Sequence, residues 1–122
     1  MTPCLYLYYN MQEQALHFYE QFKRYRKVKV PIKGNIYNLV VADTPKKKRL
    51  GLSRVSKLPS RCGMLFVYRT PVNHAFTMEK TSIPLTLIFL DSQMNIMEVF
   101  KCRPFEKRKV RPKSDYSYVI EI

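Results

Sequence analysis

The feature that most constrains this fold is a series of short β-type segments that occupies the chain from residue 63 onward. Each segment is rich in aromatic or β-branched residues and is bounded by turn-forming residues, which is typical of strands. With one earlier segment of the same kind, the predicted strands cover residues 36–42, 64–68, 75–78, 85–90, 96–100 and 116–122. Short connections favour antiparallel neighbours, so we expect a mostly antiparallel sheet that closes into a small barrel or sandwich.

The C-terminal strand has the clearest pattern, because its residues alternate strictly between two faces. One face carries Tyr116, Tyr118, Ile120 and Ile122, and the other carries Ser117, Val119 and Glu121. The stretch before it, residues 103–114, is basic and contains proline, so it is predicted to be a mobile loop.

Two helices are predicted ahead of the main run of strands. Asn10 and Glu13 form a capping-box pattern before apolar residues at helical spacing, which indicates an amphipathic helix over residues 11–26. Thr44 and Pro45 begin a second helix, which is expected to be short because Gly51 weakens it. The predicted class is therefore mostly β (α+β), with a short helix after the first strand and an extra N-terminal amphipathic helix. Residues 1–35 are expected to be an extension whose helix packs on a β-rich domain formed by residues 36–122.

The length and the cysteines narrow the class of protein. A chain of 122 residues fits a single domain that buries a core of ordinary size. Cys4, Cys62 and Cys102 are far apart and odd in number, which favours reduced thiols over a disulfide framework. No signal peptide or transmembrane segment is recognisable, so a cytoplasmic location is expected.

The charge is strongly positive and is concentrated in blocks. Lysine and arginine number 22 against nine acidic residues, a formal net charge of +13. Such blocks attract polyanions, although they also serve as solvated surface. The candidate polyanion contacts are Lys46, Lys47, Lys48, Arg49, Lys107, Arg108, Lys109 and Arg111. Tyrosines interleaved with the basic residues, namely Tyr6, Tyr8, Tyr9, Tyr19 and Tyr25, add a nucleic-acid-binding alternative.

The sequence gives only weak support for a catalytic, metal-binding or cofactor-binding site. His17 and His74 have no zinc-like spacing to the cysteines, and a structural or surface role is favoured for both. Cys62 and His74 could form a nucleophile pair, but no third orienting residue or glycine-rich oxyanion turn supports it. No catalytic residue, metal site or cofactor is therefore predicted.

Several fragments in a fixed order carry a family resemblance. They are Val41-Ala-Asp-Thr-Pro, Arg49-Leu-Gly-Leu-Ser-Arg, Gly63-Met-Leu-Phe-Val-Tyr, Phe76-Thr-Met-Glu-Lys-Thr-Ser-Ile-Pro-Leu, Ile88-Phe-Leu-Asp, and the final Tyr-Val-Ile-Glu. Together they resemble the bacterial and archaeal family known as domain of unknown function 192, over about residues 36–122. The resemblance implies a compact β-barrel-like fold with one short helix after the first strand. It implies no mechanism, because the family has no established activity.

The chain departs from the family pattern at three places. Thr77-Met78-Glu79-Lys80-Thr81 stands where the family usually has Trp-Met-Lys-Asn-Thr, and Thr86 stands where it usually has aspartate. Met94 replaces the usual hairpin glycine, so Asn95 is expected to take the left-handed backbone conformation.

The favoured function is a non-enzymatic binding or accessory module that uses a barrel rim and basic loops. The candidate rim residues are Arg54, Met78, Lys80, Thr81 and Thr86. Arg54 and the Thr86 position are expected to share one polar site. The alternatives are a nucleic-acid or other polyanion-binding protein, and a small enzyme with a site near Arg54, Met78 and Thr81.

Overall fold

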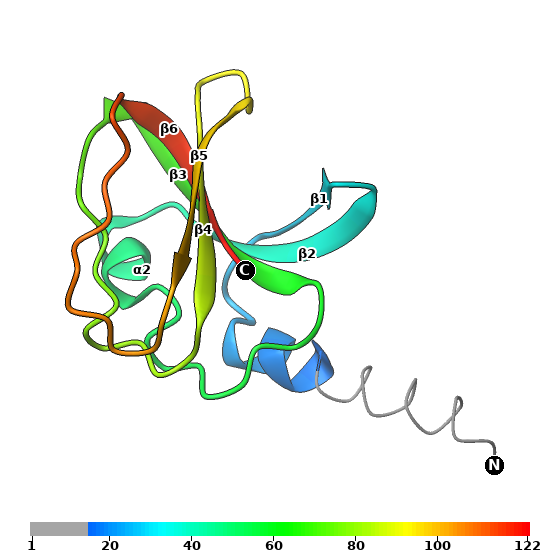
Figure 1. Cartoon of the computed structure of the whole chain (residues 1–122). Helices are drawn as coiled ribbons and strands as arrows, with labels where there is room; N and C mark the ends of the chain where they lie inside the picture. The colour runs from blue at the N-terminus through cyan, green and yellow to red at the C-terminus, as the bar shows by residue number, and fades with distance from the viewer. Residues whose placement is uncertain (1–14) are drawn as a thin grey trace, which may run out of the picture.

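The computed structural model describes residues 15–122, and its centre is a six-stranded sheet (Figure 1). A helical segment over residues 15–21 comes first. The elements that follow are β1 (Lys27–Ile32), β2 (Asn35–Ala42), α2 (Pro45–Leu50), β3 (Cys62–Val72), β4 (Leu85–Leu90), β5 (Ile96–Cys102) and β6 (Tyr116–Glu121). The mostly β, α+β class is confirmed.

The sheet is open and mixed, so of the two expected forms, a small barrel or a sandwich, the closed barrel is not formed. Its strand order is β1-β2-β3-β6-β4-β5, so β1 and β5 are its edges. Every pairing is antiparallel except that of β2 with β3. A parallel pair needs a crossover connection, and α2 with the segment after it provides one.

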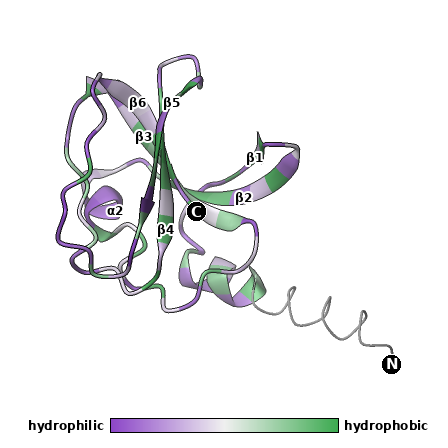
Figure 2. Ribbon diagram, in the orientation of Figure 1, coloured by the Kyte–Doolittle hydropathy of each residue, from purple (hydrophilic) through white to green (hydrophobic). Residues whose placement is uncertain are grey.

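Two apolar clusters lie on opposite faces of the sheet. The larger contains Phe66, Leu87 and Val119 and is covered by the helical segment, α2 and the long loops. The smaller contains Leu39, Ile88 and Ile120. Apolar residues colour most of the central strands in Figure 2, whereas α2 is hydrophilic. The central strands are therefore buried on both faces.

The alternation predicted for the last strand is interrupted at its start. Tyr118, Ile120 and Ile122 belong to the smaller cluster as expected, but Tyr116 packs in the larger one with Val119. The pairing of β3 with β6 is irregular at the same place, where its register shifts between Val67 and Val72.

The N-terminal helix predicted over residues 11–26 is confirmed over residues 15–21, but it ends there, and residues 22–25 form a turn and a bend instead. Residues 15–21 are helical, and Phe18 and Phe22 insert into the larger cluster. The predicted cap at Asn10 and Glu13 lies outside the described residues. Beyond the helix, the sequence patterns predict no strand at β1, which contains Pro31. Proline is tolerated there since β1 is an edge strand.

Two other predictions need correction. Residues 75–78 form no strand; only an isolated bridge joins Phe76 to Val110. That bridge, with hydrogen bonds from the Asn73 amide to the carbonyls of Pro112 and Ser114, also ties down the basic 103–114 loop that was expected to be mobile. Long-range main-chain contacts of this kind leave no local pattern in the sequence.

The predicted start of α2 is confirmed. The Thr44 hydroxyl accepts a hydrogen bond from the Lys47 N–H at 3.2 Å, and Pro45 occupies the first turn. Gly51 follows the helix with φ of +48°, a backbone conformation that favours glycine. The chain therefore turns sharply at Gly51, toward the sheet.

The β4–β5 hairpin uses a different left-handed residue from the one expected. Met94 itself has φ of +65°, and Asn95 instead donates its main-chain N–H to the Asp91 carboxylate. We expect Met94→Gly to raise the free energy of unfolding by roughly 0.5–1 kcal/mol, since the relief of the left-handed strain exceeds the added entropy of the unfolded chain. Gln93→Gly is the matched control, because it adds the same entropy without relieving strain. Thermal denaturation should rank Met94→Gly above wild type and Gln93→Gly below it; the reverse order would contradict this account.

Candidate functional site

A cleft opens between α2 and the loop over residues 74–81, on the larger-cluster side of the sheet, and we call it the α2 cleft. Its volume is about 490 Å³, within the range of small-molecule sites. It is lined by Lys48–Ser53, by Phe66 and Tyr68 of β3, by His74–Thr77 and Glu79–Thr81, and by Glu121 at the end of β6.

The floor of the α2 cleft carries a buried carboxyl group. Glu121 is only 7% exposed, because it lies on the face of β6 that also buries Val119. None of the ion pairs among residues 15–122 involves it. Burial raises the pKa of Glu121 to about 8, since desolvation disfavours the charged form. At neutral pH the floor is therefore a neutral carboxylic acid that can donate a hydrogen bond.

Gly51 keeps the cleft open above this acid. A Cβ at Gly51 would lie 3.4 Å from Cζ of Phe66 and 3.7 Å from Oε1 of Glu121. A side chain at this position would therefore fill the space above the carboxyl group. The sharp turn after α2 both directs the chain across the cleft and leaves the acid accessible.

Cationic side chains surround the cleft. The Lys48 ammonium lies 4.0 Å from the centroid of the Tyr68 ring, and burial lowers the pKa of Lys48. Arg49 and Lys80 line the cleft from opposite sides, and Glu79, which is exposed, is the one other acidic residue in the lining besides the buried Glu121. Three cations against one carboxylate give the α2 cleft a positive charge that favours anions.

The loop opposite α2 is held in place by the core. Phe76 exchanges main-chain hydrogen bonds with Val110, at 2.7 and 2.8 Å, and packs edge-on against Phe66. The Tyr116 hydroxyl donates to the main-chain oxygen of His74 at 2.8 Å, and burial raises the pKa of Tyr116 to about 12. The cleft wall is therefore anchored at several points along its length.

A family model decides the relationship of this chain to known proteins. The model described as DUF192, "Uncharacterized ACR", matches residues 28–122. The chain belongs to the DUF192 family. Among curated proteins, none matches it.

Two solved structures resemble this DUF192 protein in fold. A protein of unknown function from Novosphingobium aromaticivorans has a TM-score of 0.70 and 24% identity, over 80% of this chain and 72% of that one. A protein from Sinorhizobium meliloti, described as a "putative transcription regulator", has a TM-score of 0.69 and 23% identity, over 80% of this chain and 81% of that one. At this identity the comparison shows the fold alone.

The structure brings together only two of the five predicted rim residues. Lys80 and Thr81 line the α2 cleft. Met78 is buried in the larger cluster. Thr86 lines a separate hollow beside Cys62 and Ile122.

Arg54 lies apart from the other rim residues. It is exposed, it lines neither of these hollows, and its charge acts on Tyr25, whose pKa burial raises and Arg54 partly lowers. The enzyme site suggested near Arg54, Met78 and Thr81 and the polar site suggested for Arg54 and Thr86 therefore have no common cavity here.

The basic residues of the DUF192 chain have different environments. Lys46, Arg49, Lys107, Lys109 and Arg111 are exposed. Lys47 pairs with Asp43 at 3.6 Å and lies over the Tyr25 ring, and Lys48 enters the cleft.

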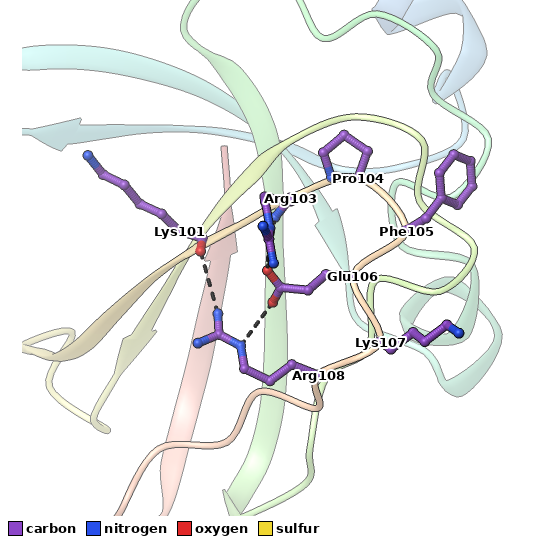
Figure 3. Close-up of a pocket in the computed structure, with 7 residues that line it drawn as sticks. All are labelled: Lys101, Arg103, Pro104, Phe105, Glu106, Lys107 and Arg108. Carbon is purple, nitrogen blue, oxygen red and sulfur yellow. Dashed lines mark hydrogen bonds and ion pairs between the residues drawn. The ribbon is translucent and has the colours of Figure 1, made fainter.

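Figure 3 shows that the 101–108 loop curves around a hollow and pairs two of its own cations. Glu106 accepts from Arg108 at 2.9 Å and from Arg103 at 3.5 Å. Burial alone would raise the pKa of Glu106, but the Arg103 N–H and the Arg108 guanidinium lower it overall. Arg108 also donates to the Lys101 main-chain oxygen at 3.5 Å. One carboxylate therefore pairs with two of the four cations in this loop, and the loop keeps a net positive charge.

Of the tyrosines predicted to stack on nucleic-acid bases, the two that the structure describes, Tyr19 and Tyr25, each lie under a lysine side chain. Lys27 lies over Tyr19 at 5.5 Å and Lys47 over Tyr25 at 4.7 Å. Tyr6, Tyr8 and Tyr9 lie outside the described residues. A ring already stacked on a lysine presents less of its face to a nucleic-acid base.

The described residues give little support for a cysteine nucleophile or a metal site. Cys62 and Cys102 are free and buried, and burial raises the pKa of each thiol, which makes them poor nucleophiles. Within residues 15–122, no three His, Cys, Asp or Glu side chains gather to hold a metal ion. The helices in that range also include none that is long and apolar enough to cross a membrane.

Glu121 is a candidate site residue that the sequence patterns did not indicate. The face of the last strand that carries it also carries Ser117 and Val119, so two of its three residues are polar and the pattern does not predict burial. Glu121 is buried because β6 pairs with both β3 and β4 and packs this face against the larger cluster.

Proposed function

We propose that this DUF192 protein is a non-enzymatic binding module that takes a small anion, a carboxylate or a phosphate monoester, in the α2 cleft. The observation that carries the proposal is Glu121, a buried acid with no ion-pair partner among the described residues, at the floor of a cleft with cationic walls. A protonated carboxyl group donates a hydrogen bond to an anion, and Lys48, Arg49 and Lys80 supply charge. Cations at the walls and a neutral donor at the floor suit an anionic ligand.

The family resemblance supports the same place. The fragments containing Arg49–Ser53, Phe66–Tyr68, Phe76–Thr81 and Glu121 are among those through which the sequence resembles the family, and residues from each of them line the α2 cleft. Binding is favoured over catalysis because the cleft offers no Cys or Ser activated by a hydrogen-bonded base.

The test is calorimetric titration at pH 6.5 with acetate, succinate, inorganic phosphate and glycerol phosphate as probes. We expect Lys48→Met to weaken binding by roughly tenfold or more, because a charge-assisted hydrogen bond contributes about 1.5–3 kcal/mol. Lys46→Met is the matched control, since Lys46 is exposed on the same helix and does not line the cleft. Stronger binding of the phosphates or of the carboxylates distinguishes the two ligand classes. The proposal fails if no probe binds, or if both lysine variants bind as wild type does.

A further inference from the structure

The two edges of the open sheet are protected to different degrees. The Val41 N–H donates to the Arg26 main-chain oxygen at 2.8 Å. Because main-chain groups alternate along an antiparallel strand, Val28 and Val30 direct theirs toward β2. The outward groups of β1 then belong to Lys27, Lys29 and Pro31. Edge lysines and an edge proline, which lacks an N–H, are the usual guards against unwanted strand pairing.

The outer edge of β5 is less protected, because it carries one such lysine, Lys101, and no proline. Thr86 and Ile122 exchange main-chain hydrogen bonds, so the main chain of Thr86 faces β6 and that of Leu87 faces β5. It follows that Val99 and Lys101 direct their main-chain groups outward. The Lys101 oxygen accepts from Arg108, whereas no strand of residues 15–122 pairs with this edge. The N–H and C=O of Val99 and the N–H of Lys101 can therefore receive another strand.

The side chains beside this edge are apolar and exposed. Val99 is 51% exposed and Ile96 is 56% exposed, both next to residues of the smaller cluster. An apolar groove of about 440 Å³ continues from Met94 and Ile96 across Ile88 and Ile120 to β1. A strand added to β5 would place alternate side chains over this apolar face.

Positively charged residues near the outer edge of β5 favour a partner strand of one charge over another. Lys101 and Lys107 are exposed close to the end of β5, and Lys29 and Lys33 line the far side of the groove. A second copy of the chain would bring another +13 charge to the same place, which opposes self-pairing. An acidic strand would be attracted instead.

We propose that the outer edge of β5 is a docking site for an extended segment of a partner protein, which has alternating apolar residues and flanking acidic residues and adds a strand beside Val99 and Lys101. Main-chain hydrogen bonds to β5 hold the segment, and its apolar side chains cover Val99 and Ile96. This site is separate from the α2 cleft and does not depend on the anion-binding proposal.

The test uses a blocked peptide of about six residues, a typical strand length, with alternating valine and threonine and an aspartate at each end. We expect the peptide to slow hydrogen exchange at the Val99 and Lys101 amides and to leave the Lys29 amide unchanged. A version with lysine in place of each aspartate should bind more weakly. Protection at β1 instead of β5, or no protection at millimolar peptide, would overturn the proposal.

A pair of variants separates main-chain pairing from side-chain contact. Val99→Pro removes an outward N–H, as Pro31 already does in β1, and is expected to weaken peptide binding by roughly tenfold or more. Val99→Thr keeps the N–H and the branched shape, and should bind within a few-fold of wild type. Equal binding by both variants contradicts the pairing. If Val99→Pro does not fold, the exchange rates of the wild-type amides decide the question. Concentration-dependent protection of these amides without peptide, with a dimer in ultracentrifugation, would assign the edge to a second copy and overturn the partner proposal.

Discussion

Wild-type protein is expected to lose stability steadily as the pH rises from about 5 to about 8, and Glu121→Gln is expected to remove most of that loss. Burial raises the pKa of the Glu121 carboxyl group from its ordinary value of 4.5 to about 8 in the fold. Between these values the folded chain holds a proton that the unfolded chain has released, so raising the pH favours unfolding. Each pH unit within the window contributes about 1.4 kcal/mol. Glutamine stays neutral, so the variant should be several kcal/mol more stable than wild type at pH 9 and nearly equal at pH 5.

Urea denaturation at a series of pH values measures this difference. Glu79→Gln is the control, since it removes an exposed carboxylate from the same cleft, and its curve should run parallel to that of wild type. If Glu121→Gln also ran parallel to wild type, the buried carboxyl group would be ionised in the fold at neutral pH, and the cleft floor would be no hydrogen-bond donor.

The same variant connects stability to function. The buried Glu121 carboxyl group lowers the free energy of unfolding at neutral pH. An acid at this position therefore does not serve the stability of the strand, which is consistent with a role in binding. Glutamine also donates a hydrogen bond, so Glu121→Gln should still bind an anion while losing the decline in affinity that ionisation of Glu121 causes in wild type above about pH 8. Glu121→Gln is therefore expected to change the pH dependence of stability while anion binding is kept.

Gly63→Ala is expected to destabilise the protein by more than about 3 kcal/mol, and to prevent folding at elevated temperature. A Cβ at Gly63 would collide with the main-chain oxygen of Glu121 and would lie 2.6 Å from Cγ2 of Ile122. The colliding oxygen belongs to β6, which pairs with both β3 and β4 and cannot move aside alone. The expected loss comes from separating two central strands, and equilibrium denaturation measures it.

Gly34→Ala is the control for backbone conformation. Gly34 has φ of +82° in the β1–β2 turn, and a Cβ there would meet no atom within 4 Å. We expect a cost of about 1–2 kcal/mol from the left-handed conformation alone. Equal losses from the two variants would show that close approach of β6 is not the reason for glycine at residue 63. Gly63 lies inside β3 and is not among the glycines with positive φ.

Local signals were sufficient for many elements of the fold. The strand predicted over residues 85–90 has the same bounds as β4, and the hydroxyl of Thr44 caps α2 as its position before Pro45 indicated. Such signals succeed because the residues that interact are within a few positions of one another in the chain. Lys80 and Thr81 also reach the cleft as candidate rim residues, since the motif that contains them forms one of its walls.

By itself, then, the sequence determined the family, the mostly β class and most of the elements, because strand alternation, helix caps and turn residues act over short separations. Only the tertiary structure decided that the sheet stays open, that β2 runs parallel to β3, and that Glu121 lies beneath Gly51 in a cationic cleft. These features join residues far apart in the chain. They depend on how strands pair and pack, and the spacing of residues along one segment does not encode that.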